Sequence, residues 1–151
     1  GIMGMCICND RRWPETYRMM GLQGVEMIML GYNTPATEPP WGFEPTHLAG
    51  LHNNLSMQSG AYQNATWVIG VAKAGCEEGC DMLGGTLIVA PTGEIVAQGR
   101  TLDDELVVAD CDLDACNHYK NTVFNFAEHR QPDQYGLITE TAGVILPPLK
   151  R

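Results

Sequence analysis

The sequence predicts an α/β fold in which strands and helices alternate along the chain, and three observations support this. Short apolar runs of strand length recur over residues 2–7, 25–30 and 66–72. Segments with helix signals lie between them, one opening at Pro14 and a longer one over residues 44–64. No internal repeat or low-complexity block interrupts the alternation, which is typical of a layered α/β domain.

The first helix and the last hairpin have the clearest local signals. Pro14 has no amide hydrogen to lose and a preset φ, so it suits the first turn of a helix that runs to about Gly21. Pro91 and Gly93 separate two strand-like runs, which predicts a hairpin of residues 86–90 and 94–98. The remaining predictions are a strand over residues 105–111 and a helix that starts at Asp112 or Asp114 and ends near Asn121.

Composition excludes several classes of function. The 151 residues are 44% hydrophobic and 18% charged, which is ordinary for a globular domain with a real core. The net charge is −9 and only nine residues are Lys or Arg, which argues against nucleic-acid binding. No apolar run approaches the roughly 20 residues of a membrane span, and no signal-peptide pattern is present. We therefore expect a cytoplasmic protein that contacts neither nucleic acid nor membrane.

Cys8 occupies the position of a candidate nucleophile. The apolar run 2–7 ends at Cys8, and a helix begins six residues later. A thiol at the carboxyl end of a strand and close to a helix start is favoured as a thiolate. The alternative is that Cys8 is a small buried hydrophobe, which is the commoner role of a strand cysteine. Cys6 shares its strand face by alternation and is interpreted as core packing.

Polar residues suited to a carboxylate or amide follow two successive strands. Arg11 and Arg12 are each able to grip a carboxylate through two parallel hydrogen bonds, although adjacent arginines are usually solvated. Asn33 and Thr34 supply donors and acceptors at the next strand end, and the following Pro35 holds Thr34 extended. The alternative interpretation of residues 33–35 is a simple turn.

The cysteines suggest neither disulfides nor a metal site. Free thiols are the default for the six cysteines of an intracellular chain of this size. Cys76 and Cys80 are close enough for zinc, but a structural site needs four ligands and no second pair completes one. We expect no metal and no cofactor.

Residues 8–15, Cys-Asn-Asp-Arg-Arg-Trp-Pro-Glu, closely resemble the nucleophile segment of N-carbamoyl-D-amino-acid amidohydrolases in the nitrilase superfamily of carbon-nitrogen hydrolases. Further segments resemble that family in the same order, and together they span nearly the whole chain. They are residues 20–22, 31–35, 55–58, 62–64, 89–96, 129–132 and 135–138.

The resemblance implies a fold and an assembly. Superfamily members form a four-layer α-β-β-α sandwich and pair with another subunit, so a homodimer or homotetramer is expected. Their Glu and Lys partners lie well before the cysteine, whereas seven residues precede Cys8 here. We therefore expect residues 1–123 to be the C-terminal half of such a domain. Residues 124–151, which lack helical or strand periodicity, are expected to be a tail that docks at a subunit interface and has a loose end.

The resemblance also implies a reaction, hydrolysis of N-carbamoyl-D-amino acids to the D-amino acid, carbon dioxide and ammonia. Cys8 would be the nucleophile, and the Asn9 backbone N–H would help a lysine to stabilise the oxyanion. The small-molecule substrate would be held through its carboxylate by Arg11, Arg12, Asn33 and Thr34. Neither Glu15 nor Lys73 matches the family's Glu or Lys.

Two alternatives remain open at this point. The chain could be a catalytically silent half-domain, because it lacks the base and the oxyanion lysine. It could instead belong to another carbon-nitrogen hydrolase, such as an amidase or nitrilase, which would keep Cys8 but need not keep an arginine clamp.

Overall fold

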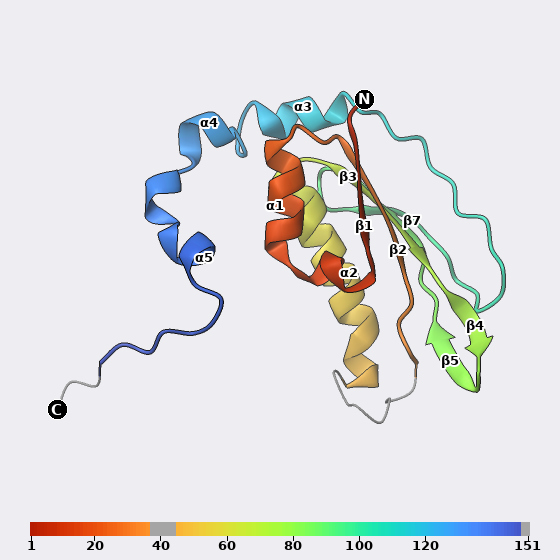
Figure 1. Cartoon of the computed structure of the whole chain (residues 1–151). Coiled ribbons are helices and arrows are strands. Elements are labelled where there is room, and N and C mark those ends of the chain that lie inside the picture. Colours follow the sequence, from red (N-terminus) through yellow and green to blue (C-terminus); the bar gives the residue numbers. More distant parts are fainter. Residues whose placement is uncertain (37–44, 149–151) are drawn as a thin grey trace.

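The computed structural model describes residues 1–36 and 45–148, and its centre is a five-stranded mixed sheet in the order β1-β2-β3-β6-β7. β1, β2 and β3 are parallel, and β6 and β7 continue the sheet antiparallel (Figure 1). The carboxyl ends of the three parallel strands therefore meet at one edge. The strands are β1 (Met3–Ile7), β2 (Met27–Tyr32), β3 (Trp67–Ala72), β6 (Leu87–Val89) and β7 (Ile95–Gln98).

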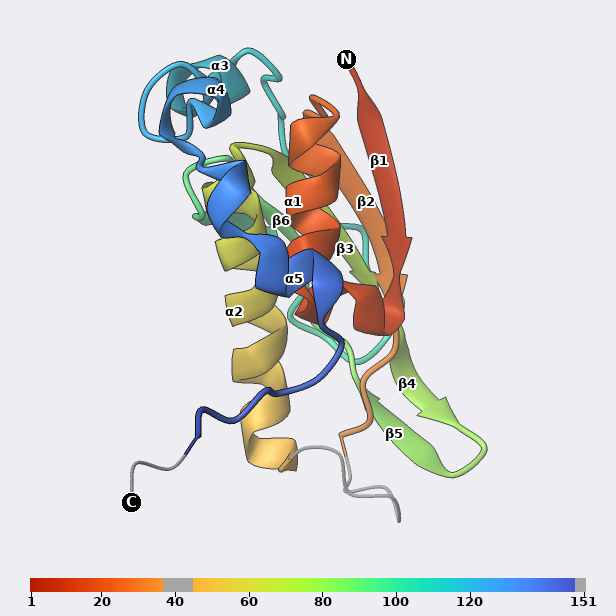
Figure 2. The ribbon, with the colours of Figure 1, turned by 60° about the vertical axis from the view of Figure 1, so that its left-hand side comes forward.

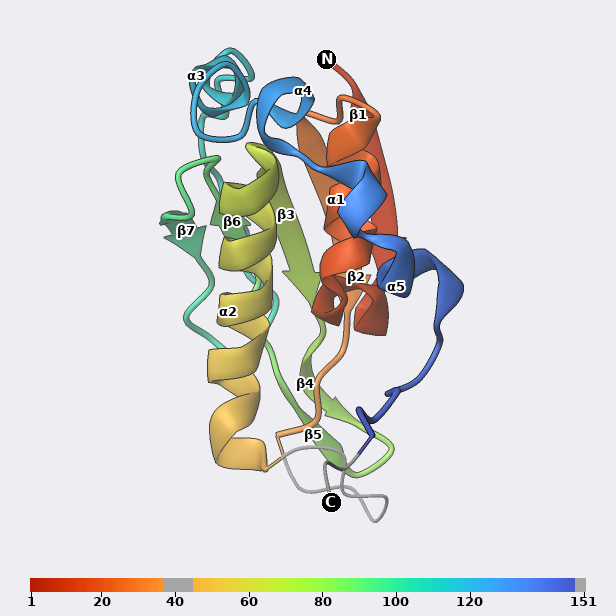
Figure 3. The same cartoon turned by 90° about the vertical axis from the view of Figure 1, so that its left-hand side faces the viewer.

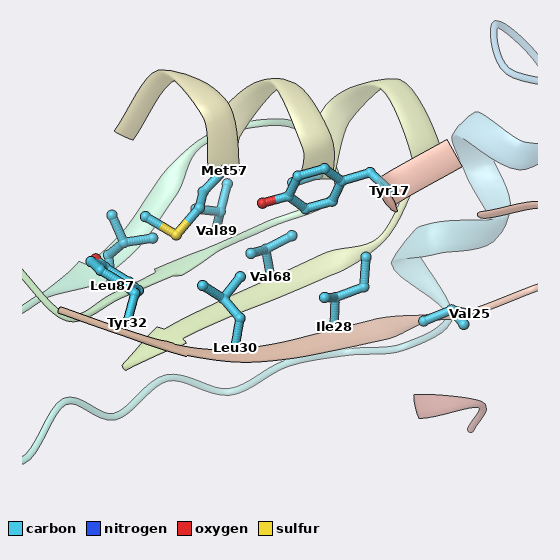
Figure 4. Packing of buried hydrophobic residues seen from close by; sticks show 10 residues of the cluster. Tyr17, Val25, Ile28, Leu30, Tyr32, Met57, Val68, Leu87 and Val89 are labelled. Carbon is cyan, nitrogen blue, oxygen red and sulfur yellow. The ribbon is translucent and has the colours of Figure 1, made fainter. Parts of the chain in front are cut away.

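Two helices, α1 (Pro14–Leu22) and α2 (Thr46–Asn64), cover one face of the sheet (Figures 2 and 3). Both agree with the sequence prediction, and α1 starts at Pro14 as expected. Figure 4 shows Tyr17 and Met57 on the inner side of the helices, facing the aliphatic side chains of the strands. This buried cluster consists of Tyr17, Val25, Ile28, Leu30, Tyr32, Met57, Ala61, Val68, Leu87 and Val89.

The other sheet face is only partly covered. An extended segment of residues 101–113 packs Val107, Ala109 and Cys111 against Trp67 and Ile88. The prediction of a strand over residues 105–111 is wrong, because this alternating segment lies on the sheet face and joins no ladder. Apolar and polar residues alternate in this segment because every second side chain packs on the sheet. An extended chain that forms no strand pairing can show the same alternation.

That face is open along β1 and at the carboxyl end of β3. Met3, Met5 and Ile7 of β1 are exposed, and so is Val71 at the end of β3. The apolar run of residues 66–72 predicts a strand buried on both faces, and this prediction is wrong at the carboxyl end of β3. The result is an apolar hollow lined by β1, β2 and β3, which we call the open sheet face: Met5, Cys6, Ile7, Asp10, Met29, Leu30, Gly31 and Val71.

A two-stranded hairpin that the sequence analysis did not predict extends from the carboxyl edge of the sheet (Figure 1). It consists of β4 (Ala74–Glu77) and β5 (Cys80–Leu83). Its turn uses positive φ at Glu78 and Gly79, of 50° and 79°. Leu83 N–H donates to Thr34 O at 2.8 Å, so the hairpin is tied to the segment that follows β2.

The C-terminal region contains short helices, α3 (Ala115–Lys120), α4 (Phe126–His129), a 3₁₀ turn (Pro132–Gln134) and α5 (Gly136–Glu140). Its first part packs on the chain's own helices: Tyr62 contacts Phe124 edge-to-face, and Arg18 stacks on Phe126 at 4.2 Å. Within the described ranges, no helix has the length and apolar character needed to cross a bilayer. The prolines at 39 and 40 predict an ordered loop over residues 36–43, and this segment falls almost entirely outside the described residues.

Candidate active site

The candidate site is built on the sharp turn that links β1 to α1. β1 ends at Ile7, and a 3₁₀ turn (Cys8–Arg12) follows at once. Asp10 closes this turn, because its Oδ2 accepts the Ile7 N–H at 3.0 Å. Cys8 adopts φ of +48°, in the left-handed region that L-residues other than glycine, asparagine and aspartate rarely enter. A residue held there marks a position where function commonly requires an unfavourable backbone.

The turn brings Cys8 beside Asn33. The half-buried Cys8 Sγ lies 3.7 Å from Asn33 Oδ1, which is within the range of a thiol hydrogen bond. Asn33 directly follows β2, and β1 and β2 are parallel neighbours, so both residues come from the carboxyl edge of the sheet. This agrees with the sequence expectation that Cys8 and Asn33 share one site. Asn33 is exposed and is therefore available to a ligand.

Cys6 lies in β1, two residues before Cys8, and both thiols pack partly against the same buried cluster. Burial, helped by the nearby Asp10 carboxylate, raises the pKa of Cys6 from 9.0 to about 11. Its side chain packs against the cluster under α1 and α2. A protonated thiol packed in this way is a poor nucleophile, which agrees with the interpretation of Cys6 as core packing.

Arg11 is buried under the turn, with 2% of its surface exposed. Its Nη1 donates to the Cys8 carbonyl oxygen at 2.6 Å, and its Nη2 donates to Thr34 Oγ1 at 3.0 Å. Nη2 also donates to Asn53 Oδ1, and the guanidinium lies 4.3 Å above the Tyr32 ring. Burial lowers the pKa of Arg11, and the adjacent positive Arg12 lowers it further.

These contacts differ from the expectation of a carboxylate clamp open to a ligand. Thr34, like Arg11, is buried, at 5% exposure, and Asn53 Nδ2 also donates to its Oγ1 at 3.1 Å. The substrate-binding role of Arg11 and Thr34 stays a prediction. In this chain both terminal nitrogens of Arg11 and the Thr34 hydroxyl are already engaged by protein partners, whereas the buried Arg11 Nε has no hydrogen-bond partner among the described residues.

Arg12 lies at a surface that Cys8 does not share. It is exposed and lines a groove of about 370 Å³ between the Cys8 turn and α2. Within the described ranges, Cys8 is not among the residues that line this groove. Hydrogen bonds therefore group Cys8, Asn33, Arg11 and Thr34, whereas Arg12, together with Arg11, lines the groove on the helix side of the turn.

Asn53 is a site residue that the sequence analysis missed. It lies on α2, just outside the family-like segment of residues 55–58, and is 3% exposed. One signal was present: Ala49, Asn53, Met57 and Ala61 follow one another at intervals of four, and all four are buried. An amide on the buried stripe of a helix needs a polar partner, and that partner is Arg11.

The other candidates from the sequence do not join Cys8. Lys73 Nζ pairs with Glu77 Oε1 at 3.4 Å beside the hairpin. In the β4–β5 register Cys76 opposes Asp81 and Cys80 opposes Glu77, so the two thiols project from opposite faces. Among residues 1–36 and 45–148, no three His, Cys, Asp or Glu side chains converge as they would around a metal ion.

Known proteins share this sequence and this fold. The chain is 31% identical over 153 aligned residues to N-carbamoylputrescine amidase of Arabidopsis thaliana, an alignment that covers 93% of this chain and 48% of the relative. It is 25% identical over 111 residues to a nitrilase of Pyrococcus abyssi, covering 74% of this chain and 37% of the relative. The chain thus spans about half or less of the length of these curated relatives.

The fold is shared with a carbon-nitrogen hydrolase from Helicobacter pylori G27, at a TM-score of 0.78 and 19% identity. That superposition covers 92% of this chain and 49% of the other. Residues 1–121 match the family described as carbon-nitrogen hydrolase. The narrower resemblance to N-carbamoyl-D-amino-acid amidohydrolases stays a prediction. The nitrilase-like α/β fold and the matched residues together show that the chain belongs to the carbon-nitrogen hydrolase family.

Proposed function

We propose that this chain carries the cysteine nucleophile of a hydrolase that cleaves a carbon–nitrogen bond of a small N-carbamoyl compound. The observation that carries the proposal is the left-handed Cys8 at the carboxyl end of β1, with Sγ beside the exposed Asn33. A nucleophile presented on a sharp turn at a strand end is accessible to a substrate while its backbone is held by the sheet.

The reaction proceeds by covalent catalysis. The Cys8 thiolate attacks the carbonyl carbon of the ureido group, a nitrogen leaving group departs with a proton, and water then cleaves the thioester-like bond to regenerate the thiol. A glutamate serves as general base, and a lysine together with the Asn9 backbone N–H stabilises the oxyanion. Asn33 contacts the substrate beside the reacting carbonyl. The cysteine and its neighbours need no cofactor for these steps.

The glutamate and lysine come, in this proposal, from the other half of an α-β-β-α sandwich that packs on the open sheet face. Two observations support this. The chain covers 48% of its N-carbamoylputrescine amidase relative. Met5 is 78% exposed and Ile7 is 69% exposed on a continuous apolar sheet surface, which is typical of an interface. Residues 1–123 would then form the nucleophile-bearing half.

We propose an N-carbamoyl-D-amino acid as substrate, on the strength of the motif in residues 8–15. A carboxylate in that substrate requires a cation, and Arg12 is the exposed arginine of the motif. The buried Arg11 and Thr34 would then hold the residues that line the pocket in place.

A second candidate substrate is an N-carbamoyl amine without a carboxylate. It is favoured by the 31% identity to N-carbamoylputrescine amidase and by the burial of Arg11, which removes half of the expected clamp from the surface. Cys8 and Asn33 would play the same roles in this reaction.

The test is ammonia release from N-carbamoyl-D-phenylalanine and from N-carbamoylputrescine. Each substrate is offered to the 151-residue chain alone and to the chain mixed with the amino-terminal half of a relative. Release only from the mixture, and faster from the N-carbamoyl-D-amino acid, is the expected result. Release by the chain alone would contradict the proposed origin of the glutamate and lysine.

Variants separate the two substrates. Arg12→Gln is expected to raise KM for the carboxylate-bearing substrate at least about tenfold, because a charge-assisted pair is lost, and to leave N-carbamoylputrescine unaffected. Equal turnover of both substrates by the unaltered mixture would contradict the clamp. No release under any condition would leave the silent half-domain as the better description.

A further inference from the structure

Arg11 connects three separate parts of the site. Its Nη1 binds the Cys8 carbonyl oxygen at 2.6 Å, and Cys8 has the left-handed φ of +48°. Its Nη2 binds Thr34 Oγ1 at 3.0 Å, just beyond the end of β2, and Asn53 Oδ1 on α2. One guanidinium therefore links the nucleophile turn, the carboxyl end of a neighbouring strand and the helix that covers the sheet.

Burial of this guanidinium is costly unless its hydrogen bonds are made. Its acceptors among the described residues are neutral oxygens, and Tyr32 stacks at 4.3 Å on one side. The fork geometry of arginine lets two nitrogens engage acceptors in fixed directions, which a lysine ammonium cannot reproduce. Such an arrangement fixes the direction of the Cys8 carbonyl more than it adds net stability.

The backbone conformation of Cys8 decides where its side chain lies, and the hydrogen bond to its carbonyl oxygen restrains that conformation. A cysteine in the left-handed region relaxes toward an ordinary backbone unless its neighbours hold it. The Ile7 N–H to Asp10 bond of 3.0 Å holds the turn on one side, and the Arg11 bond holds the Cys8 peptide plane on the other. With both in place, Sγ stays 3.7 Å from Asn33 Oδ1.

We infer that Arg11, oriented by Asn53 and Thr34, is a positioning residue that holds the Cys8 turn in its left-handed conformation and does not bind the substrate carboxylate. This inference deepens the proposed function, since it gives Cys8 its orientation as the nucleophile. It also assigns Asn53, a residue outside every motif of the sequence, to the support of the site.

The test uses three thiols of the 151-residue chain as internal reporters. Alkylation by iodoacetamide is followed by peptide mass spectrometry at pH 8. Cys8 reports the turn, the buried Cys116 reports unfolding of the whole domain, and the exposed Cys76 gives the rate of an accessible thiol. This readout needs no turnover, so it stands apart from the ammonia-release test of the proposed function.

Asn53→Ala removes one acceptor of the Arg11 guanidinium and is expected to raise the rate of Cys8 alkylation about tenfold, because a charge-assisted hydrogen bond is lost and the turn opens. Arg11→Lys is expected to act in the same direction. Asn53→Asp keeps the acceptor oxygen and is expected to stay within about twofold of the unaltered chain. Asn54→Ala, the same change at the next position of α2, is the matched control and is expected to change nothing.

Two results would overturn the inference. The first is a Cys8 rate that does not change in either Asn53→Ala or Arg11→Lys. The second is a parallel rise of Cys8 and Cys116 alkylation, since that would show a loss of global stability with no specific effect on the turn. In the assembled enzyme, the inference further expects Arg11→Lys to lower kcat equally for carboxylate-bearing and carboxylate-free substrates, whereas a clamp would raise KM for the first class alone.

Discussion

Cys6 and Cys8 differ in chemistry although only one residue separates them. Cys6 is part of regular β1 and packs beneath α1 and α2, which raises its pKa to about 11. Cys8 lies one residue past the strand, in a left-handed turn beside the exposed Asn33. The end of the strand therefore separates a structural thiol from the proposed nucleophile.

The Cys6 thiol is expected to make stability depend on alkaline pH. The folded chain retains a proton up to about pH 11 that the unfolded chain releases near its ordinary pKa of 9.0. Because the folded pKa is raised, the contribution of this group is complete below pH 9 and is lost as the pH rises toward 11. Urea unfolding of the unaltered chain and of Cys6→Ala at pH 8 and pH 10.5 measures it.

The unaltered chain is expected to lose more stability than Cys6→Ala between these two pH values. Tyr17, Tyr32, Cys111 and Cys116 also have raised pKa values, but they are present in both proteins, and the part of the Tyr17 shift that Cys6 causes belongs to the Cys6 effect. If the difference between the two unfolding free energies is the same at both pH values, the thiol is not buried in solution as described.

At the scale of elements, the close packing of α1 on α2 depends on glycine. A Cβ added at Gly60 would lie 2.5 Å from the ring of the buried Tyr17, whereas one added at Gly50 of the same helix would lie 3.7 Å from Leu83. Gly60 therefore lets α2 approach α1, and Gly50 has no such role. Tyr17 also faces the sheet (Figure 4), so its contact with α2 helps to fix the distance between the helices and the strands.

The two glycines form a matched pair of substitutions. Gly60→Ala is expected to lower the free energy of unfolding by about 1–3 kcal/mol, because overpacking outweighs the gain in helix propensity. Gly50→Ala is expected to raise it by up to about 1 kcal/mol through propensity alone. Chemical unfolding followed by circular dichroism measures both, and stabilisation by Gly60→Ala would contradict the described helix contact.

Local chemistry predicts some elements of this chain and not others. Pro14 marks the start of α1, and the apolar run before Cys8 marks β1, because both signals act within a few residues. The β4–β5 hairpin was missed because its turn is Glu78-Gly79 and not the favoured Asn-Gly, and its strands are rich in weak strand formers.

The residues of the site likewise divide into those that the local sequence predicts and those that it does not. Cys8 and Asn33 are predictable, because residues that follow adjacent parallel strands meet at one edge. The contact between Arg11 and Asn53 joins positions 42 residues apart, and no local signal names it. The burial of Arg11, which was expected to face a ligand, was not predictable either, because its exposure depends on how α2 packs.

For the whole molecule, the distribution of apolar surface is the main observation. α1 and α2 cover one face of the sheet, and residues 101–113 cover part of the other (Figures 1 and 2). The open sheet face that remains lies at the same end of the strands as Cys8. A second sheet packed there would place its side chains close to the nucleophile. The homodimer or homotetramer stays a prediction.

Met5→Lys tests this surface. Because Met5 is 78% exposed, the change is expected to alter the stability of the chain alone by no more than about 0.5 kcal/mol. It is expected to weaken association with the amino-terminal half of a relative at least about tenfold, because a charge would be buried. Isothermal titration calorimetry measures the affinity.

Met19→Lys is the matched control, since Met19 is 58% exposed on α1. It is expected to leave association unchanged. Equal affinities of the Met5→Lys and Met19→Lys chains would show that the open sheet face is not the surface that receives the other half.

The central claim, that Cys8 is the nucleophile of a carbon-nitrogen hydrolase, is tested most directly by peptide mass spectrometry of the assembled halves quenched during turnover of an N-carbamoyl-D-amino acid. The expected result is a carbonyl-linked adduct on the peptide that contains Cys8, and neither adduct nor ammonia release with Cys8→Ala. An adduct on another residue, or full turnover by Cys8→Ala, would contradict it.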